Sequence, residues 1–333
     1  MKDSHLAMMN KKIKIITTGG TIACHEGGNG FRPDVEGDNL INRLLSKGFP
    51  EAEDIRKAAD KGEIRFDFCS LMCIDSSDMR IRDQVKIAEE VSRSLDDYDG
   101  IIITHGTDTM AYTAAALSVM LRNVPVPVIL TGSQLSVDEE GTDASVNFCD
   151  SVRVVMKEIR GIYICFGGYL IDGRYATKVD SDDPNAFVST DRAYIYNIND
   201  LELLITRHEL LMENETKEEF SFKPLAEKEI LLIKMHPAFS GKVLRNMLGS
   251  GCEAAVIELY GKGGLPAGDE EFLSVIEDYI KKGMRVFVIS QCIYRDTDLT
   301  RYEVGRKLLA KGVEVIRNYS TEYAIMYAVS SVE

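Results

Sequence analysis

The chain has 333 residues, a formal net charge of -14 and a pI near 5.0. This acidic balance, without any basic stripe, excludes a nucleic acid backbone as the partner. No apolar run approaches the roughly 18 residues that a membrane-spanning helix needs, and the amino terminus lacks a hydrophobic signal core. The seven cysteines are odd in number and show no CxxC spacing, which favours reduced thiols over a disulfide framework. We therefore expect a cytoplasmic protein without a membrane segment.

Strand and helix patterns alternate through the first half of the chain. Short apolar runs bounded by turn residues indicate buried strands, and longer amphipathic stretches indicate helices. An alternation of this kind predicts a mainly parallel sheet whose crossover connections are helices. The predicted strands are residues 12–17, 64–71, 101–104, 126–130 and 161–166, and the predicted helices are residues 39–47, 84–94, 111–121 and 147–157.

Residues 191–228 lack this alternation and include a charge-dense stretch, so we interpret them as an interdomain connection. The expected fold class is α/β with two domains. A larger N-terminal domain (residues 11–195) has a mainly parallel sheet flanked by helices, a linker covers 196–228, and a smaller C-terminal α/β domain (229–333) has a short parallel sheet. In that domain the predicted strands are 230–235, 254–259, 285–290 and 313–316, and the predicted helices are 270–282 and 302–310. Residues 1–10 show no clear periodicity and are left out of the fold prediction.

Two threonine-rich turns, each hinged by glycine, follow predicted strands. Residues 17–22 (TTGGTI) come after the first strand, and residues 105–110 (HGTDTM) come after the third. In open parallel sheets ligands bind beyond the carboxyl ends of the strands, where glycine lets backbone N–H groups approach a substrate. A threonine that attacks an acyl carbon needs a base and oxyanion donors, and Thr21 directly follows two glycines, whose backbone N–H groups are expected to bind the developing oxyanion. The alternatives are plain strand punctuation at the first turn and an N-capped helix start at the second.

Several short motifs together resemble the asparaginase/glutaminase family, in particular its cytoplasmic type I L-asparaginases. The longest, residues 105–114 (HGTDTMAYTA), is highly specific. The resemblance implies a hydrolase of a linear amide that converts L-asparagine to L-aspartate and ammonia through a threonyl acyl-enzyme, with L-glutamine as the other substrate to consider. The remaining motifs run in family order: residues 18–22 (TGGTI), 75–79 (DSSDM), 97–100 (DYDG), 131–134 (TGSQ) and 177–178 (TK), followed by 260–261 (YG) and 291–292 (QC).

The resemblance assigns the catalytic steps to four residues. Thr21 is the expected nucleophile that forms the ester, while Thr107, Asp108 and Lys178 form a relay that moves protons and activates water. These residue types suit the chemistry. Desolvation lowers the pKa of a semi-buried lysine and a neighbouring carboxylate raises it, and the sequence leaves open which effect is larger.

The resemblance also implies a polar clamp for the amino-acid substrate. Asp108 binds the α-ammonium, Ser76 and Ser77 hold the α-carboxylate, and Ser133 lines the pocket through its backbone carbonyl. Taken alone, residues 75–78 also fit a cap of the helix that follows. The full substrate-binding set implied by the resemblance is Gly20, Ser76, Ser77, Thr107, Asp108 and Ser133.

Residues 23–32 contain three glycines in four positions, which predicts a mobile segment. We hypothesise a lid that closes over the substrate and excludes water, and a plain surface loop is the alternative. Type I enzymes carry a tyrosine ten positions after the nucleophile, whereas the corresponding residue here is Phe31, which lacks the hydroxyl. His25 is the nearest titratable candidate to replace the hydrogen bond, and a solvated loop histidine is its other interpretation. The sequence therefore predicts either a substitute donor or a slow first step.

Other functions remain as alternatives. The missing tyrosine hydroxyl leaves open a weakened relative that binds asparagine or aspartate as a sensor. Another family alternative, the amidase component of a tRNA-dependent amidotransferase, normally has an additional amino-terminal domain, for which the residues before the first strand leave no room. No GxGxxG or GxxxxGK(S/T) motif follows a strand, and histidines and cysteines form no ligand pattern, so we expect neither a cofactor nor a metal. The family resemblance implies a homodimer or homotetramer.

Overall fold

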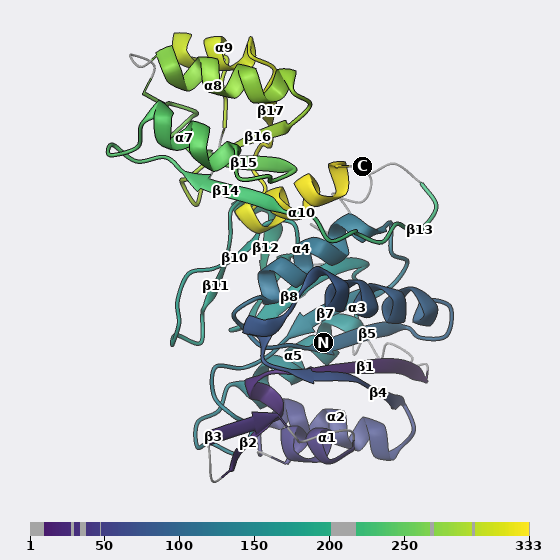
Figure 1. The fold of residues 1–333 in the computed structure, drawn as a ribbon. Coiled ribbons are helices and arrows are strands. Elements are labelled where there is room, and N and C mark those ends of the chain that lie inside the picture. The colour runs from purple at the N-terminus through teal and green to yellow at the C-terminus, as the bar shows by residue number, and fades with distance from the viewer. Residues whose placement is uncertain are drawn as a thin grey trace. The chain divides into compact units, whose positions relative to one another are not determined.

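The computed structural model describes residues 10–27, 30–33, 38–46, 48–200, 218–266, 270–294 and 297–332 (Figure 1). The chain forms two compact units. The first contains the chain up to Val188 together with Ile195–Pro224, and the second contains Ser189–Tyr194 and the chain from Leu225 onward. The polypeptide therefore passes from one unit to the other three times. No helix in the described ranges is long and apolar enough to cross a membrane.

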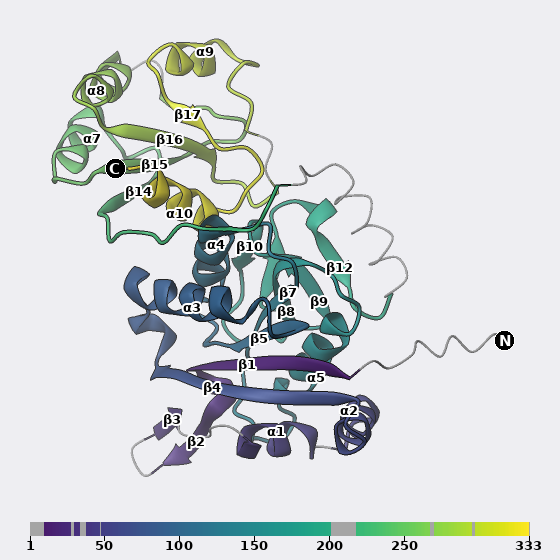
Figure 2. The same ribbon diagram turned by 90° about the vertical axis from the view of Figure 1, so that its right-hand side faces the viewer.

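A seven-stranded sheet forms the centre of the first unit, in the order β12-β9-β8-β7-β5-β1-β4. Neighbouring strands from β4 to β8 run parallel. At one edge β9 pairs antiparallel with β8, and β12 pairs antiparallel with β9. Figure 2 shows β1 and β4 side by side along the other edge. The strands are β1 (Lys11–Gly19), β4 (Ile64–Ile74), β5 (Gly100–Thr104), β7 (Pro127–Thr131), β8 (Gly161–Phe166), β9 (Tyr169–Asp172) and β12 (Ile195–Asn197). The predicted mainly parallel sheet is confirmed.

Helices cover both faces of this sheet. On one face α1, α2 and α5 share a core with alternate residues of the central strands, including Ile13, Ile15 and Ile102. On the other face α3 packs against α4, and α4 contacts β7 and β8 (Figure 2). Nearly every residue of α4 is buried, which explains why its sequence has no polar stripe. The helices are α1 (Asp38–Leu45), α2 (Pro50–Asp60), α3 (Ile81–Ser94), α4 (Met110–Met120) and α5 (Ala144–Val155).

The first unit also contains short 3-10 turns and short paired strands. The 3-10 turns η1 (Thr21–Ala23) and η2 (Ser76–Asp78) follow β1 and β4, and the hairpin of β2 (Cys24–Gly27) with β3 (Gly30–Pro33) follows η1. Within the segment interpreted as a connection, β12 joins the main sheet. The remaining pairs are β10 (Ala176–Lys178) with β11 (Phe187–Ser189), and β6 (Leu121–Arg122) with β13 (Ser221–Phe222).

The second unit is built on four parallel strands in the order β14-β15-β16-β17. Alternate strand residues face opposite sides: Ile257 and Val288 pack with α7, α8 and α9, whereas Val256 and Phe287 pack with α10. The predicted short parallel sheet is confirmed. The elements are η3 (Arg192–Tyr194), β14 (Ile230–Lys234), α7 (Gly241–Leu248), β15 (Ala254–Leu259), α8 (Glu270–Lys281), β16 (Arg285–Ser290), α9 (Glu303–Leu309), β17 (Glu314–Val315) and α10 (Thr321–Ser331).

Candidate active site

Glycine brings three strand ends of the first unit together. Gly20 has a φ of +82°, and a Cβ added to it would lie 2.4 Å from the backbone nitrogen of Gly106. A Cβ added to Gly106 would in turn lie 2.6 Å from the Oγ of Ser76. The Gly106 backbone leaves no space for a side chain at Gly20, and the Ser76 side chain leaves none at Gly106, so glycine allows the approach. The turns after β1 and β5 therefore contact each other, and η2 after β4 contacts the second turn.

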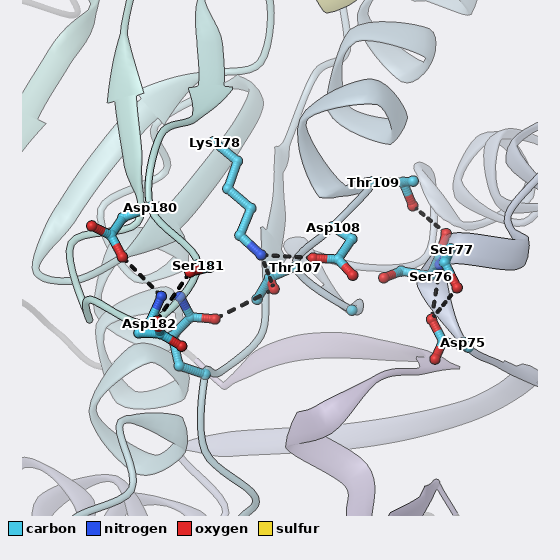
Figure 3. A network of polar contacts seen from close by, with 12 residues as sticks. Asp75, Ser76, Ser77, Thr107, Asp108, Thr109, Lys178, Asp180, Ser181 and Asp182 are labelled. Atoms are coloured by element: carbon cyan, nitrogen blue, oxygen red, sulfur yellow. Dashed lines mark hydrogen bonds and ion pairs between the residues drawn. The ribbon is translucent and has the colours of Figure 1, made fainter.

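Lys178 joins this group from β10, about seventy positions further along the chain. Its amino group donates to Thr107 Oγ1 over 2.8 Å and to Asp108 Oδ1 over 2.7 Å (Figure 3). Thr107 is buried, whereas the Asp108 side chain is 64% exposed. The ammonium group therefore bridges a buried hydroxyl and a carboxylate open to water. Three of the four expected catalytic side chains are thus in direct contact.

Gln134 also contacts the relay. Because Lys178 donates to the Thr107 oxygen, the Thr107 hydroxyl is free to donate, and Gln134 Oε1 accepts from it over 3.4 Å. The Gln134 Nε2 donates to the Asp183 carbonyl over 3.3 Å, which orients the amide. Sequence reasoning included Gln134 in a motif but gave it no role. Its position in the loop three residues after the end of β7 was the available signal.

The η2 turn carries the two serines expected to hold the substrate carboxylate. Asp75 Oδ1 accepts from the Ser77 N–H over 2.9 Å and from its hydroxyl over 2.8 Å, and these bonds lower the pKa of Asp75 (Figure 3). The Thr109 hydroxyl donates to the Ser76 carbonyl over 2.7 Å, which ties η2 to the second turn. Asp75 caps η2 itself. The cap is therefore part of the structure that presents Ser76, not a feature of α3.

Ser133 is buried in the loop after β7. Its hydroxyl donates to the Leu135 carbonyl within the same loop. Asp143 stabilises this loop because its carboxylate accepts from the backbone N–H groups of Gln134 and Leu135. The Asn147 amide adds a donor to the Gly132 carbonyl over 3.0 Å.

Thr21, the expected nucleophile, is the first residue of η1 and half-buried. It directly follows Gly20, so the contact between Gly20 and Gly106 also brings Thr21 to the second turn. His25 and Phe31, expected in the lid, lie on the paired strands β2 and β3. Their side chains lie outside the described part of the structure, so the lid and the substitute hydrogen bond stay predictions.

Among the described residues no group of three or more His, Cys, Asp or Glu side chains is arranged to hold a metal ion. The chemistry available to the described side chains comes from hydroxyl, carboxylate, amide and ammonium groups. Such a set suits acyl transfer with proton relay.

The fold and these strand-end motifs belong to a known class of amidohydrolases. Residues 12–210 match the family described as "Asparaginase, N-terminal", and residues 229–329 match the "Glutaminase/Asparaginase C-terminal domain". The chain therefore belongs to the asparaginase/glutaminase family, and the resemblance read from its motifs is confirmed.

Its relatives include enzymes with two different names. The chain is 35% identical over 302 residues to an L-asparaginase of Thermococcus kodakarensis (91% of this chain, 87% of the relative) and 32% identical over 309 residues to L-asparaginase 1 of Escherichia coli (92% and 87%). It is 33% identical over 317 residues to a glutamyl-tRNA(Gln) amidotransferase subunit of Pyrococcus abyssi (91% and 67%). The solved structure of the thermostable L-asparaginase from Thermococcus kodakarensis superposes with a TM-score of 0.78 at 29% identity, over 95% of this chain and 90% of that one.

Proposed function

We propose that this protein is an L-asparagine amidohydrolase that releases L-aspartate and ammonia. The observation that carries the proposal is the contact of the Lys178 amino group with both Thr107 Oγ1 and Asp108 Oδ1, next to the turn that bears Thr21. The similarity to two enzymes named L-asparaginase supports the same substrate. L-glutamine is the other amide to test, because one methylene changes discrimination by only about 1–3 kcal/mol.

In the proposed first step, the Thr21 hydroxyl attacks the side-chain amide carbon of asparagine. The Thr21 hydroxyl proton passes to the amide nitrogen, the C–N bond breaks, ammonia leaves, and a threonyl ester remains. The negative charge that develops on the amide oxygen needs N–H donors, and the glycine-hinged backbone before Thr21 supports such a site.

In the proposed second step, water hydrolyses the ester. The relay of Thr107, Asp108 and Lys178 takes a proton from the attacking water and returns one to the Thr21 oxygen. Aspartate is released, and the Thr21 hydroxyl is restored. The hydrogen bonds of 2.8 and 2.7 Å at Lys178 support proton exchange within this group. Since the Asp108 carboxylate is exposed to water, it can also meet the α-ammonium of the substrate.

Steady-state ammonia release from asparagine and from glutamine tests the proposal directly. Wild type is expected to turn over asparagine, and Thr21→Ala is expected to abolish turnover while the protein stays folded. Full activity in Thr21→Ala would overturn the nucleophile assignment. A wild type that binds aspartate in calorimetry but releases no ammonia from either amide would favour the sensor alternative.

The similarity to the amidotransferase of Pyrococcus abyssi supports a second candidate function, the supply of ammonia within a tRNA-dependent complex. The two candidates differ in a measurable way. An asparaginase turns over free asparagine without a partner protein, whereas a partner-dependent amidase has little activity alone. We further propose a homodimer or homotetramer in the cytoplasm, and light scattering of the purified chain tests the oligomeric state.

A further inference from the structure

His105 is a buried titratable residue to which the proposed reaction gives no role. It directly follows β5, its side chain is fully buried, and its backbone N–H donates to the Thr131 carbonyl over 2.8 Å. The ring nitrogens have two different neighbours. Nδ1 lies 2.7 Å from the Gly106 carbonyl oxygen, and Nε2 lies 2.9 Å from Thr113 Oγ1.

The chemistry of these neighbours fixes the direction of each hydrogen bond. A carbonyl oxygen only accepts, so Nδ1 carries a proton and donates to Gly106. Burial lowers the pKa of His105 to about 4, so the ring is neutral at pH 7 and Nε2 accepts the Thr113 hydroxyl proton. With that proton committed, the Thr113 oxygen accepts from Gln84 Nε2 over 3.4 Å.

These hydrogen bonds form a chain with one donor-to-acceptor direction: Gln84 donates to Thr113, Thr113 to His105, and His105 to the Gly106 carbonyl. Gln84 lies on α3 and Thr113 on α4, and both side chains are buried, so two packed helices anchor the chain. The Gly106–Thr107 peptide is planar and trans, so fixing the Gly106 carbonyl also fixes the direction of the Thr107 N–H. Gly106 is also the residue that contacts Gly20, and Thr107 is the residue that contacts Lys178.

We propose that His105 is a positioning residue for the amidohydrolase reaction, a role that rests on the proposed function. Held by Thr113 and Gln84, its imidazole fixes the Gly106 peptide so that the Thr107 hydroxyl stays within hydrogen-bond reach of Lys178. His105 touches neither substrate nor reacting atoms and acts only through this peptide. Losing the chain lets the second turn shift while Ser77 of η2 keeps its own hydrogen bonds to Asp75.

The test compares two nearly isosteric changes at buried threonines. Thr113→Val removes the donor to His105. Thr104→Val, one residue before His105, removes a buried hydroxyl that has no hydrogen bond within the described ranges, and it leaves intact the Thr104 carbonyl that accepts from Thr18. We expect Thr113→Val to lower kcat for asparagine roughly tenfold with KM nearly unchanged, because a small misplacement affects the chemical steps more than binding. Thr104→Val is expected to keep kcat within about twofold, and Thr113→Ser to restore most of it.

Equal kcat values for folded Thr113→Val and Thr104→Val would overturn the positioning role, since a purely structural hydroxyl lowers stability without lowering the kcat of folded protein. Absence of turnover in wild type would instead count against the proposed function. Nitrogen-15 NMR of the intact, histidine-labelled wild type gives a readout independent of activity. The signals that disappear in His105→Gln are expected to show a neutral ring protonated at Nδ1 at pH 7, and protonation at Nε2 would overturn the chain.

Discussion

Gly20 and Gly106 approach each other so closely that a Cβ on Gly20 would lie 2.4 Å from the Gly106 nitrogen. We therefore expect Gly20→Ala to lower the free energy of unfolding by about 3 kcal/mol or more, since it adds a backbone clash to an unfavourable positive φ. Ammonia release is expected to disappear, because the two turns separate. Urea denaturation and the amidase assay measure these effects.

Gly62→Ala is the matched control. Gly62 has a similar φ of +74°, but a Cβ there would meet nothing within 4 Å. The expected cost is only the backbone strain of about 1–2 kcal/mol, without loss of activity. If both variants lost the same free energy of unfolding, the close contact between the two turns would make no contribution to stability beyond the backbone strain.

The Lys178 contacts predict a separate effect on turnover. Lys178→Met keeps most of the side-chain volume but removes the amino group from Thr107 and Asp108, so kcat for asparagine is expected to fall by about 10²–10⁴-fold. The control is Lys57→Met, which removes an exposed ion pair with Glu53 and is expected to change neither kcat nor stability measurably. A kcat within threefold of wild type, roughly 0.6 kcal/mol, would remove Lys178 from the reaction.

The burial and the length of the strands explain which parts of the fold were predictable from the sequence. β1, β5, β7 and β8 are buried apolar runs, and their patterns predicted the parallel sheet directly. The antiparallel strands β9 and β12 were missed because each has only three or four residues, and their pairing partners are set by tertiary contacts. A short strand has too few residues for its period to stand out.

The helix α2 was missed although its signals are local. Pro50 occupies its first turn, and Ala52, Ile55 and Ala58 are buried at three-residue intervals. Small alanines make this apolar stripe weak in sequence, since two of its three members add little hydrophobic contrast. The helix prediction depended on large apolar residues, so it did not include α2.

In the candidate site, too, some features were predictable from the sequence and others were not. Glycine and threonine spacing indicated the two turns, but no local pattern predicts that a lysine about seventy positions away reaches them, and that expectation came from family resemblance. The partners of His105 were not predictable, because Thr113 and Gln84 come from two helices that meet only in the folded chain. Side-chain networks of this kind depend on packing angles that spacing does not encode.

Asn147 is predicted to be a stability determinant of the loop after β7. It is buried, its Nδ2 donates to the Gly132 carbonyl and to Asp143, and its Oδ1 accepts from the Gly167 N–H. Asn147→Leu leaves those partners unsatisfied and is expected to lower the free energy of unfolding by about 2–4 kcal/mol.

Chemical denaturation measures that loss, with Asn199→Leu as the control. The Asn199 side chain is exposed, so its replacement is expected to change stability by less than about 0.5 kcal/mol. Equal stabilities for the two variants would show that the Asn147 amide has no net role in the loop.

The buried His105 ring predicts a pH dependence of stability with a definite sign. The unfolded chain takes up a proton near the ordinary histidine pKa of 6.5, whereas burial lowers the pKa of His105 to about 4 in the folded protein. Between these values the unfolded state binds one more proton, so the stability contribution is fully present above pH 6.5 and falls as the pH drops toward 4. The expected loss from this residue is about 3 kcal/mol.

His105→Gln cannot titrate, so its unfolding free energy, measured in urea at pH 7 and at pH 4.5, is expected to fall less than that of wild type. Other titrating groups contribute equally to both proteins and cancel in the comparison. Parallel pH profiles for the two proteins would contradict a neutral, buried His105.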